Sequence, residues 1–207
     1  MTLCVKGFAM LDLFPLLSFV VVASITPGPN NIMLATAGAR AGFRATVPHL
    51  LGISCGLAVQ IALVGMGIAA LIHRHPEVTL AMRVLAVGYL LWLAVRLLRP
   101  GPANPHDSAG QPLSFAGAAL FQWVNPKAWM MALTINAAFL PADVSPGVAI
   151  SQVALVAAVA NLPCITCWAA AGASIRHQLA DPTRRRAFDS LMGLALAGTA
   201  AWLALSQ

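Results

Sequence analysis

Two groups of residues that could bind a small polar solute lie at prolines inside long apolar stretches. The first is Thr26-Pro27-Gly28-Pro29-Asn30 and the second is Asn125-Pro126-Lys127. A proline inside a helix removes a backbone donor and clashes with the preceding turn. In a bilayer, carbonyls freed in this way must be satisfied by protein, ion or water, so such breaks line a cavity or are buried in protein. The carbonyls that these prolines would free belong to Ala23, Ile25 and Gln122.

The chemistry expected at the first break is recognition of a carboxylate. A helix that begins near Pro29 would present free backbone N–H groups and the positive end of its dipole. Thr26, Asn30 and Asn31 flank the break, and each asparagine amide offers both a donor and an acceptor. The alternative is a structural kink whose freed carbonyls are covered by neighbouring helices. Two breaks at related places favour a binding site.

Lys127 is the lysine that lies far from either edge of its apolar stretch. Because a charge at the centre of a bilayer costs a few kcal/mol or more, it should face a cavity or a partner. It could contact the carboxylate of a solute, or hold a gate by binding the carbonyls freed at Pro27 and Pro29. A purely structural lysine, or one that reaches to the membrane interface, is the alternative.

Further polar side chains inside the apolar runs are secondary candidates for the site. Taken singly, such groups more often hydrogen-bond one helix to another. They are Gln60, Tyr89, Gln122, Asn136 and Asn161.

Small residues four apart, Gly38 with Gly42 and Gly52 with Gly56, predict close packing of helices. Contact between two copies in a homodimer is the alternative use of such residues.

Cys164 and Cys167 form a C-x-x-C pair after Pro163. Residues three apart lie on neighbouring faces of one helix, where two thiols could serve redox chemistry or a soft metal. Cysteine is also a common small apolar filler, and no acidic residue or histidine lies nearby. Packing is therefore the favoured role, and we expect no bound metal.

The composition predicts an integral membrane protein. Of the 207 residues, 59% are hydrophobic and 9% are charged, whereas soluble domains carry about 25% charged residues. The net charge of +6 does not indicate nucleic-acid binding, because the basic residues are scattered at the ends of apolar runs. No nucleotide-binding loop, catalytic triad or zinc motif is visible, so we expect neither an enzyme nor a cofactor.

Six apolar segments are long enough to cross a bilayer as helices, so the expected class is an all-α membrane protein. Residues 1–9 read as an extension, expected to be poorly ordered, and residues 99–113 as a linker between halves 10–98 and 114–207. Three helices per half require the second half to enter the membrane inverted, with breaks in the first helix of each half. This pattern predicts an inverted repeat whose site lies near the midplane, between the first and fourth apolar segments. The segments are 12–39, 44–72, 78–98, 114–140, 147–175 and 187–206.

The distribution of lysine and arginine predicts the orientation in the membrane. Eight arginines lie at the ends and loops after segments 1, 3 and 5, against Lys6, Arg74 and Arg83 on the opposite side. Positive charge concentrates on the cytoplasmic side, so both termini are expected outside. The eight are Arg40, Arg44, Arg96, Arg99, Arg176, Arg184, Arg185 and Arg186.

From Met10 onwards the chain resembles the LysE/RhtB amino-acid exporters. The resemblance is carried by Thr26 to Asn30, by Gly52-Ile53-Ser54-Cys55-Gly56 and by Gly88-Tyr89-Leu90-Leu91-Trp92-Leu93 through Arg96. The run Asn125-Pro126-Lys127-Ala128 completes it. Together, in this order, these motifs are fairly specific.

The resemblance implies export of amino acids across a bacterial cytoplasmic membrane, powered by an ion gradient that is usually of protons. Its signature positions fall on Thr26 to Asn30 and Asn125 to Lys127. Some relatives carry aspartate at the position of Asn30 and many a histidine near Gln60, whereas both positions are uncharged here. We therefore expect a neutral or small polar amino acid as substrate. The competing functions are an intramembrane thiol oxidoreductase and a heavy-metal efflux protein.

Overall fold

The computed structural model describes residues 13–99, 110–141 and 144–205, which are helical or in short turns without a strand. The expectations for residues 1–9 and for most of the 99–113 linker lie outside these residues. The α-helices are α1 (Leu13–Ile25), α2 (Pro29–Ala41), α3 (Val47–Gly65), α4 (Ile68–His73), α5 (Pro76–Leu98), α6 (Phe115–Phe121), α7 (Pro126–Ala138), α8 (Pro146–Ser174) and α9 (Pro182–Leu205), with 3₁₀ turns at Phe43–Thr46 and Gln178–Ala180.

Helices suited to a bilayer dominate the described part of the chain. Four of them, α3 with its preceding 3₁₀ turn, α5, α8 and α9, are long and apolar enough to cross a membrane. The pair α1 and α2 adds a fifth candidate span if it is counted as one element, with a bend of 57° between its halves. Segment 114–140 forms the shorter helices α6 and α7, which do not meet the same criterion.

Segment 44–72 is not one continuous helix, contrary to the sequence expectation. Helix α3 ends at Gly65, and α4 begins at Ile68 after a turn in which Gly67 has φ of 98°. That left-handed backbone conformation is readily adopted by glycine and interrupts the helix. Segment 147–175, by contrast, is the single helix α8, with Pro163 inside it.

The close packing predicted for small residues occurs within the chain. At Gly38 of α2, an added Cβ would lie 2.2 Å from the carbonyl oxygen of Ala169 on α8, and at Gly172 of α8 one would lie 2.0 Å from that of Ala35. At Gly52 of α3 an added Cβ would lie 2.3 Å from the Phe115 carbonyl oxygen of α6. Helix backbones therefore meet directly at these positions, and α2 is fixed closely against α8.

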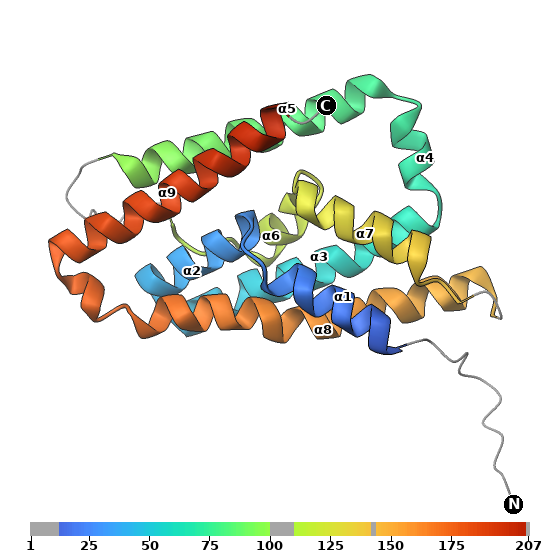
Figure 1. Ribbon diagram of the computed structural model, residues 1–207, viewed down its shortest axis with the longest axis horizontal. Helices are drawn as coiled ribbons and strands as arrows, with labels where there is room; N and C mark the ends of the chain where they lie inside the picture. The colour runs from blue at the N-terminus through green and yellow to red at the C-terminus, as the bar shows by residue number, and fades with distance from the viewer. Residues whose placement is uncertain (1–12, 100–109, 142–143, 206–207) are drawn as a thin grey trace, which may run out of the picture.

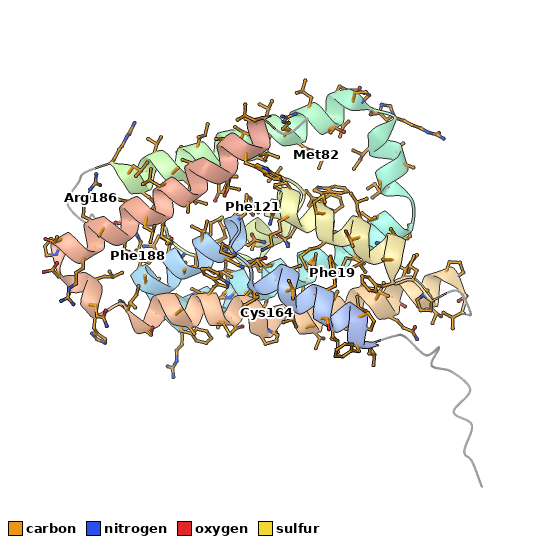
Figure 2. The ribbon with its side chains drawn as sticks, viewed as in Figure 1. Phe19, Met82, Phe121, Cys164, Arg186 and Phe188 are labelled. Atoms are coloured by element: carbon orange, nitrogen blue, oxygen red, sulfur yellow. The ribbon has the colours of Figure 1, made fainter. Side chains whose placement is uncertain are left out.

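Helices α5 and α9 lie along one another on one side of the molecule (Figure 1). An ion pair of 2.9 Å between Arg40 and the buried carboxylate of Asp189 links α9 to the end of α2. Arg186, at the beginning of α9 (Figure 2), donates a hydrogen bond of 2.6 Å to the carbonyl of Leu98. The outward faces of both helices carry exposed leucines and tryptophans such as Leu85 and Trp202, as expected against lipid.

Candidate functional site

The two proline breaks face one cavity of about 30 Å³. Its walls come from the α1–α2 break, the α6–α7 connection, α3 and α8. The lining residues are Ser24, Gly28, Asn30, Asn31, Ile53, Leu57, Gln122, Asn125, Lys127, Ala128, Met131, Asn161 and Ile165.

At the first break, α1 ends at Ile25 and α2 begins at Pro29. Proline is favoured at the first helical position, because its missing N–H has no partner there and its φ suits a helix. The side chain of Asn31 donates to the carbonyls of Ser24 and Thr26, both at 2.8 Å, and so closes the break from inside. Gly28, the residue before α2, provides no side-chain cap for the first backbone N–H groups of that helix.

The second break has the same form but is capped differently. Helix α7 begins at Pro126, and the side-chain oxygen of Asn125 accepts from the backbone N–H of Lys127 at 3.2 Å. The indole of Trp129 donates to the Trp123 carbonyl at 2.8 Å. The start of α7 therefore has its own cap, whereas that of α2 has none from a side chain.

The three carbonyls expected to lose helical partners each accept a hydrogen bond from a side chain. The hydroxyl of Thr26 donates to the Ala23 carbonyl at 2.9 Å. The indole of Trp168 on α8 donates to the Ile25 carbonyl at 3.0 Å. The carbonyl of Gln122 accepts from the amide of Gln60 on α3 at 3.2 Å.

Lys127 reaches across the first break from the second. Its ammonium donates to the Thr26 carbonyl at 2.5 Å, the Thr26 hydroxyl at 3.0 Å and the Pro27 carbonyl at 3.4 Å. For the gate role, one of the two alternatives predicted for this lysine, the expected acceptors were the carbonyls of Ala23 and Ile25. The carbonyls that the ammonium binds are instead those of Thr26 and Pro27. The half-buried lysine lies over Gly28, where an added Cβ would come within 2.9 Å of Lys127 Cδ.

A network of amides centred on Gln122 forms the deeper side of the cavity. The side-chain oxygen of Gln122 accepts from Asn30 at 2.7 Å and from Asn125 at 3.5 Å. Its side-chain nitrogen donates to the Ile53 carbonyl at 3.3 Å. The three amides are buried and come from both breaks, so they join α2, α3 and the α6–α7 connection.

Seven of the thirteen sequence-predicted site residues line this cavity, and Gln60 and Tyr89 are among those that do not. Asn161 lines the cavity and donates to the Ser54 hydroxyl at 3.3 Å. Tyr89 packs against Phe121, with ring centroids 5.2 Å apart, and lines a separate cavity of about 330 Å³ between α2 and α5. Thr26 and Pro27 are exposed and reach the site through Lys127.

Sequence reasoning missed Ser24 and Trp168 as parts of the site. Ser24 is a buried polar residue in an apolar run, two positions before the Thr26 motif, and that spacing was the available signal. Trp168 lies far from the break in sequence, so its contact with Ile25 depends on how α8 packs. The apolar walls, Leu57 and Met131 among them, show no sequence signal beyond hydrophobicity.

Cys55, Cys164 and Cys167 are free thiols. Cys164 is buried and donates to the Ala160 carbonyl at 3.4 Å, whereas Cys55 and Cys167 are exposed. In the described ranges, histidine, cysteine and acidic side chains form no group of three that could hold a metal ion. The packing role predicted for this C-x-x-C pair agrees with the burial of Cys164 but not with the exposure of Cys167.

Known proteins similar to this chain are bacterial efflux proteins. A cysteine/O-acetylserine efflux protein of Klebsiella pneumoniae is 30% identical over 157 residues, which are 75% of this chain and 79% of the relative. The proteins of that name from Salmonella typhimurium and Escherichia coli K12 are 30% and 27% identical, with the same shares of each chain covered. No solved structure matches this chain.

The family comparison covers nearly the whole chain. Residues 21–207 match the LysE type translocator family, which includes both proline breaks and all helices from α2 to α9. The amide-lined cavity between the breaks thus lies inside the region that defines the match. This chain belongs to the LysE type translocator family.

Proposed function

We propose that this protein is a transporter, not an enzyme, that exports a small neutral amino acid such as cysteine or O-acetylserine. The observation that carries the proposal is the meeting of two helix starts, at Pro29 and Pro126, with Lys127 and uncharged amides around one cavity. The relatives named for cysteine/O-acetylserine efflux support the same substrate class.

The carboxylate of the substrate binds at the start of α2. That helix start presents backbone N–H groups and a positive dipole end, and it lacks a side-chain cap. The ammonium of Lys127 lies across the same place, bound to the carbonyls of Thr26 and Pro27. An incoming carboxylate would exchange those carbonyls for a charge-assisted hydrogen bond to the lysine.

The cavity between the two breaks is smaller than an amino acid. A cavity of about 30 Å³ has room for one or two waters and not for an amino acid. Export therefore needs a movement of one break against the other. Lys127 carries the side-chain contact with Thr26 and Pro27 across the two breaks, so its release would accompany opening.

The architecture behind this movement is a pair of inverted three-helix repeats with six membrane crossings. Ile25 lies four residues before Pro29 and Gln122 four before Pro126, and α2 and α7 both have 13 residues. The Ile25 carbonyl binds Trp168 of α8, and the Gln122 carbonyl binds Gln60 of α3. Each of these two carbonyls is thus bound by a side chain from the second helix of the other half, and this correspondence supports the proposed inverted repeat.

Coupling uses an ion gradient across the bacterial inner membrane, and proton antiport is the mode proposed. In this proposal the site lies near the midplane of the membrane and both termini lie outside the cell. The partners are the lipid bilayer and the substrate, and nucleic acid is not among them. A homodimer is the alternative use of the small residues, two of which, Gly38 and Gly52, pack against α8 and α6 of the same chain.

The test is transport by the purified protein in proteoliposomes. With an imposed pH gradient, labelled L-cysteine should move against its own concentration gradient, and the movement should stop when an ionophore abolishes the gradient. A panel including L-lysine and L-glutamate should show weaker transport of charged side chains. Transport of none of these amino acids under pH or sodium gradients would contradict the proposal.

A further inference from the structure

Two buried oxygens at the cavity have no donor. Asn30 Oδ1 and Ser24 Oγ lack hydrogen-bond partners, although the residues are only 8% and 3% exposed. Both residues line the cavity between the breaks. Buried polar groups in proteins are nearly always paired, so each exception calls for a ligand or water to complete it.

The orientation of the Asn30 amide follows from fixed backbone groups. Because the Ile53 carbonyl can only accept, the nitrogen of the Gln122 side chain must face it. The Gln122 oxygen then faces Asn30 and can only accept, so Asn30 must present its nitrogen. Asn30 Oδ1 is consequently the end of the amide that is left free, whichever way the amides are first assigned.

The cavity therefore has a donor-rich side and an acceptor-rich side. Lys127 and the uncapped start of α2 supply donors, and Asn30 Oδ1 with Ser24 Oγ supplies acceptors. An α-amino acid carries its carboxylate and its ammonium on one carbon, and the ammonium has three N–H donors and no acceptor. The two sides are complementary to that pair of groups.

Resting on the proposed function, we propose that Asn30 Oδ1 and Ser24 Oγ form the subsite for the α-ammonium of the substrate. Neutral oxygens satisfy the ammonium by hydrogen bonds without adding a negative charge that would hold it permanently. The subsite therefore selects α-amino acids with a free amino group, and N-acylated or deaminated analogues bind poorly. The carboxylate, held at Lys127, offsets the cost of burying the ammonium.

The experiment compares L-cysteine with 3-mercaptopropionate, which lacks the ammonium, and with cysteamine, which lacks the carboxylate. Binding is measured by calorimetry on the purified full chain under reducing conditions in sodium-free buffer, with Ser24→Ala as the variant. Its affinity for L-cysteine should fall about 10- to 100-fold, the usual range for a hydrogen bond to a charged group. Its affinity for 3-mercaptopropionate should not change.

The matched control is Ser151→Ala on α8, which removes an exposed hydroxyl bonded to the Val148 carbonyl and lies outside the cavity lining. It should leave binding of all three compounds unchanged. If Ser24→Ala does not fold, Asn30→Asp provides the test. A negative charge at the subsite should raise affinity for cysteamine about 10-fold or more relative to 3-mercaptopropionate.

Two results would overturn the subsite. The first is that Ser24→Ala loses as much affinity for 3-mercaptopropionate as for L-cysteine. The second is that Asn30→Asp leaves the affinity for cysteamine relative to 3-mercaptopropionate unchanged. A loss in Ser24→Ala that occurs only when sodium is present would assign the oxygens to a metal cation instead. Absence of L-cysteine binding to the wild-type protein would contradict the proposed function itself, which separates the two failures.

Discussion

Lys127 joins the two helix breaks at the level of single atoms. Its backbone N–H is capped by Asn125, and its ammonium binds Thr26 and Pro27 some hundred positions earlier in the chain. A lysine ammonium in a membrane-spanning region is costly unless it is paired with protein groups. Backbone carbonyls and a hydroxyl provide that pairing here, and a substrate carboxylate would provide a stronger one.

Replacing Lys127 with methionine removes the charge at similar length. If the lysine binds the carboxylate, affinity for L-cysteine should fall by about 1–3 kcal/mol, the worth of a charge-assisted hydrogen bond. Affinity for cysteamine, which has no carboxylate, should not change, and Lys127→Arg should keep part of the effect. Turnover altered at constant affinity would assign the lysine to a gate, and unchanged binding and transport would contradict both roles.

Gly28 gives a way to displace the lysine without removing it. A Cβ at this position would lie 2.9 Å from Lys127 Cδ and 3.3 Å from its Nζ. Because the obstacle is a flexible side chain, Gly28→Ala should fold normally, with a melting temperature near that of the wild type, but should bind L-cysteine more weakly. Gly88→Ala, where nothing lies within 4 Å, is the matched control. Equal affinities in the two variants would show that the lysine's position does not matter.

The proline breaks act at the scale of the helix. Pro27 and Pro29 separate α1 from α2, and the pair is bent by 57°. Replacing both prolines with alanine should let the backbone between α1 and α2 form more helical hydrogen bonds. Transport should then be impaired, while membrane insertion is preserved. Pro76→Ala, at the first position of α5, is the control. Full transport activity in the double variant, measured in proteoliposomes, would contradict a role for the break.

The approach of α2 to α8 predicts which glycines are needed for folding. At Gly172 an added Cβ would lie 2.0 Å from the backbone oxygen of Ala35, so the helices would have to separate. Gly172→Ala should cost about 1–3 kcal/mol of stability, as overpacking does. At Gly198 of α9 nothing lies within 4 Å, so Gly198→Ala should melt at or above the wild-type temperature in detergent. The opposite order would show that α2 and α8 are not closely packed.

Some elements could be predicted from sequence and others could not. The apolar segments predicted α5 and α8 within two residues, because length and hydrophobicity determine such helices. Helix α9 begins at Pro182, five residues before the predicted segment 187–206, because its first turns carry arginines that the apolar pattern leaves out. The separation of α4 from α3 was missed, since the turn at Gly67 depends on one backbone angle. The bond from Asn30 to Gln122 and the carbonyl partners of Lys127 arise from packing between the halves, which no local pattern encodes.

At the scale of the whole molecule, successive long elements run in alternating directions (Figure 1). The ends of α2, α5 and α8 and the beginning of α9 lie at one end of the molecule, which gathers the arginines counted above. The beginning of α1 and the helix α4, which Arg74 follows, lie towards the opposite end. Arg83 donates a hydrogen bond of 2.9 Å to the carbonyl of Leu203 near the end of α9. The arginines that follow the first, third and fifth apolar segments in the sequence thus lie at one end of the long axis of the molecule.

This asymmetry predicts the topology. Loops rich in arginine stay in the cytoplasm, so the end that carries Arg40, Arg176 and Arg186 should face inwards. A reporter active only in the cytoplasm should be active when fused after Pro105 and silent when fused after Gln207, and a periplasmic reporter should give the opposite pattern. Replacing Arg184, Arg185 and Arg186 by glutamine should weaken this preference, since they contribute three of the eight arginines on that side. Cytoplasmic activity at Gln207 in the unaltered chain would contradict the proposed six crossings with outside termini, and with them the inverted repeat proposed to relate the two breaks.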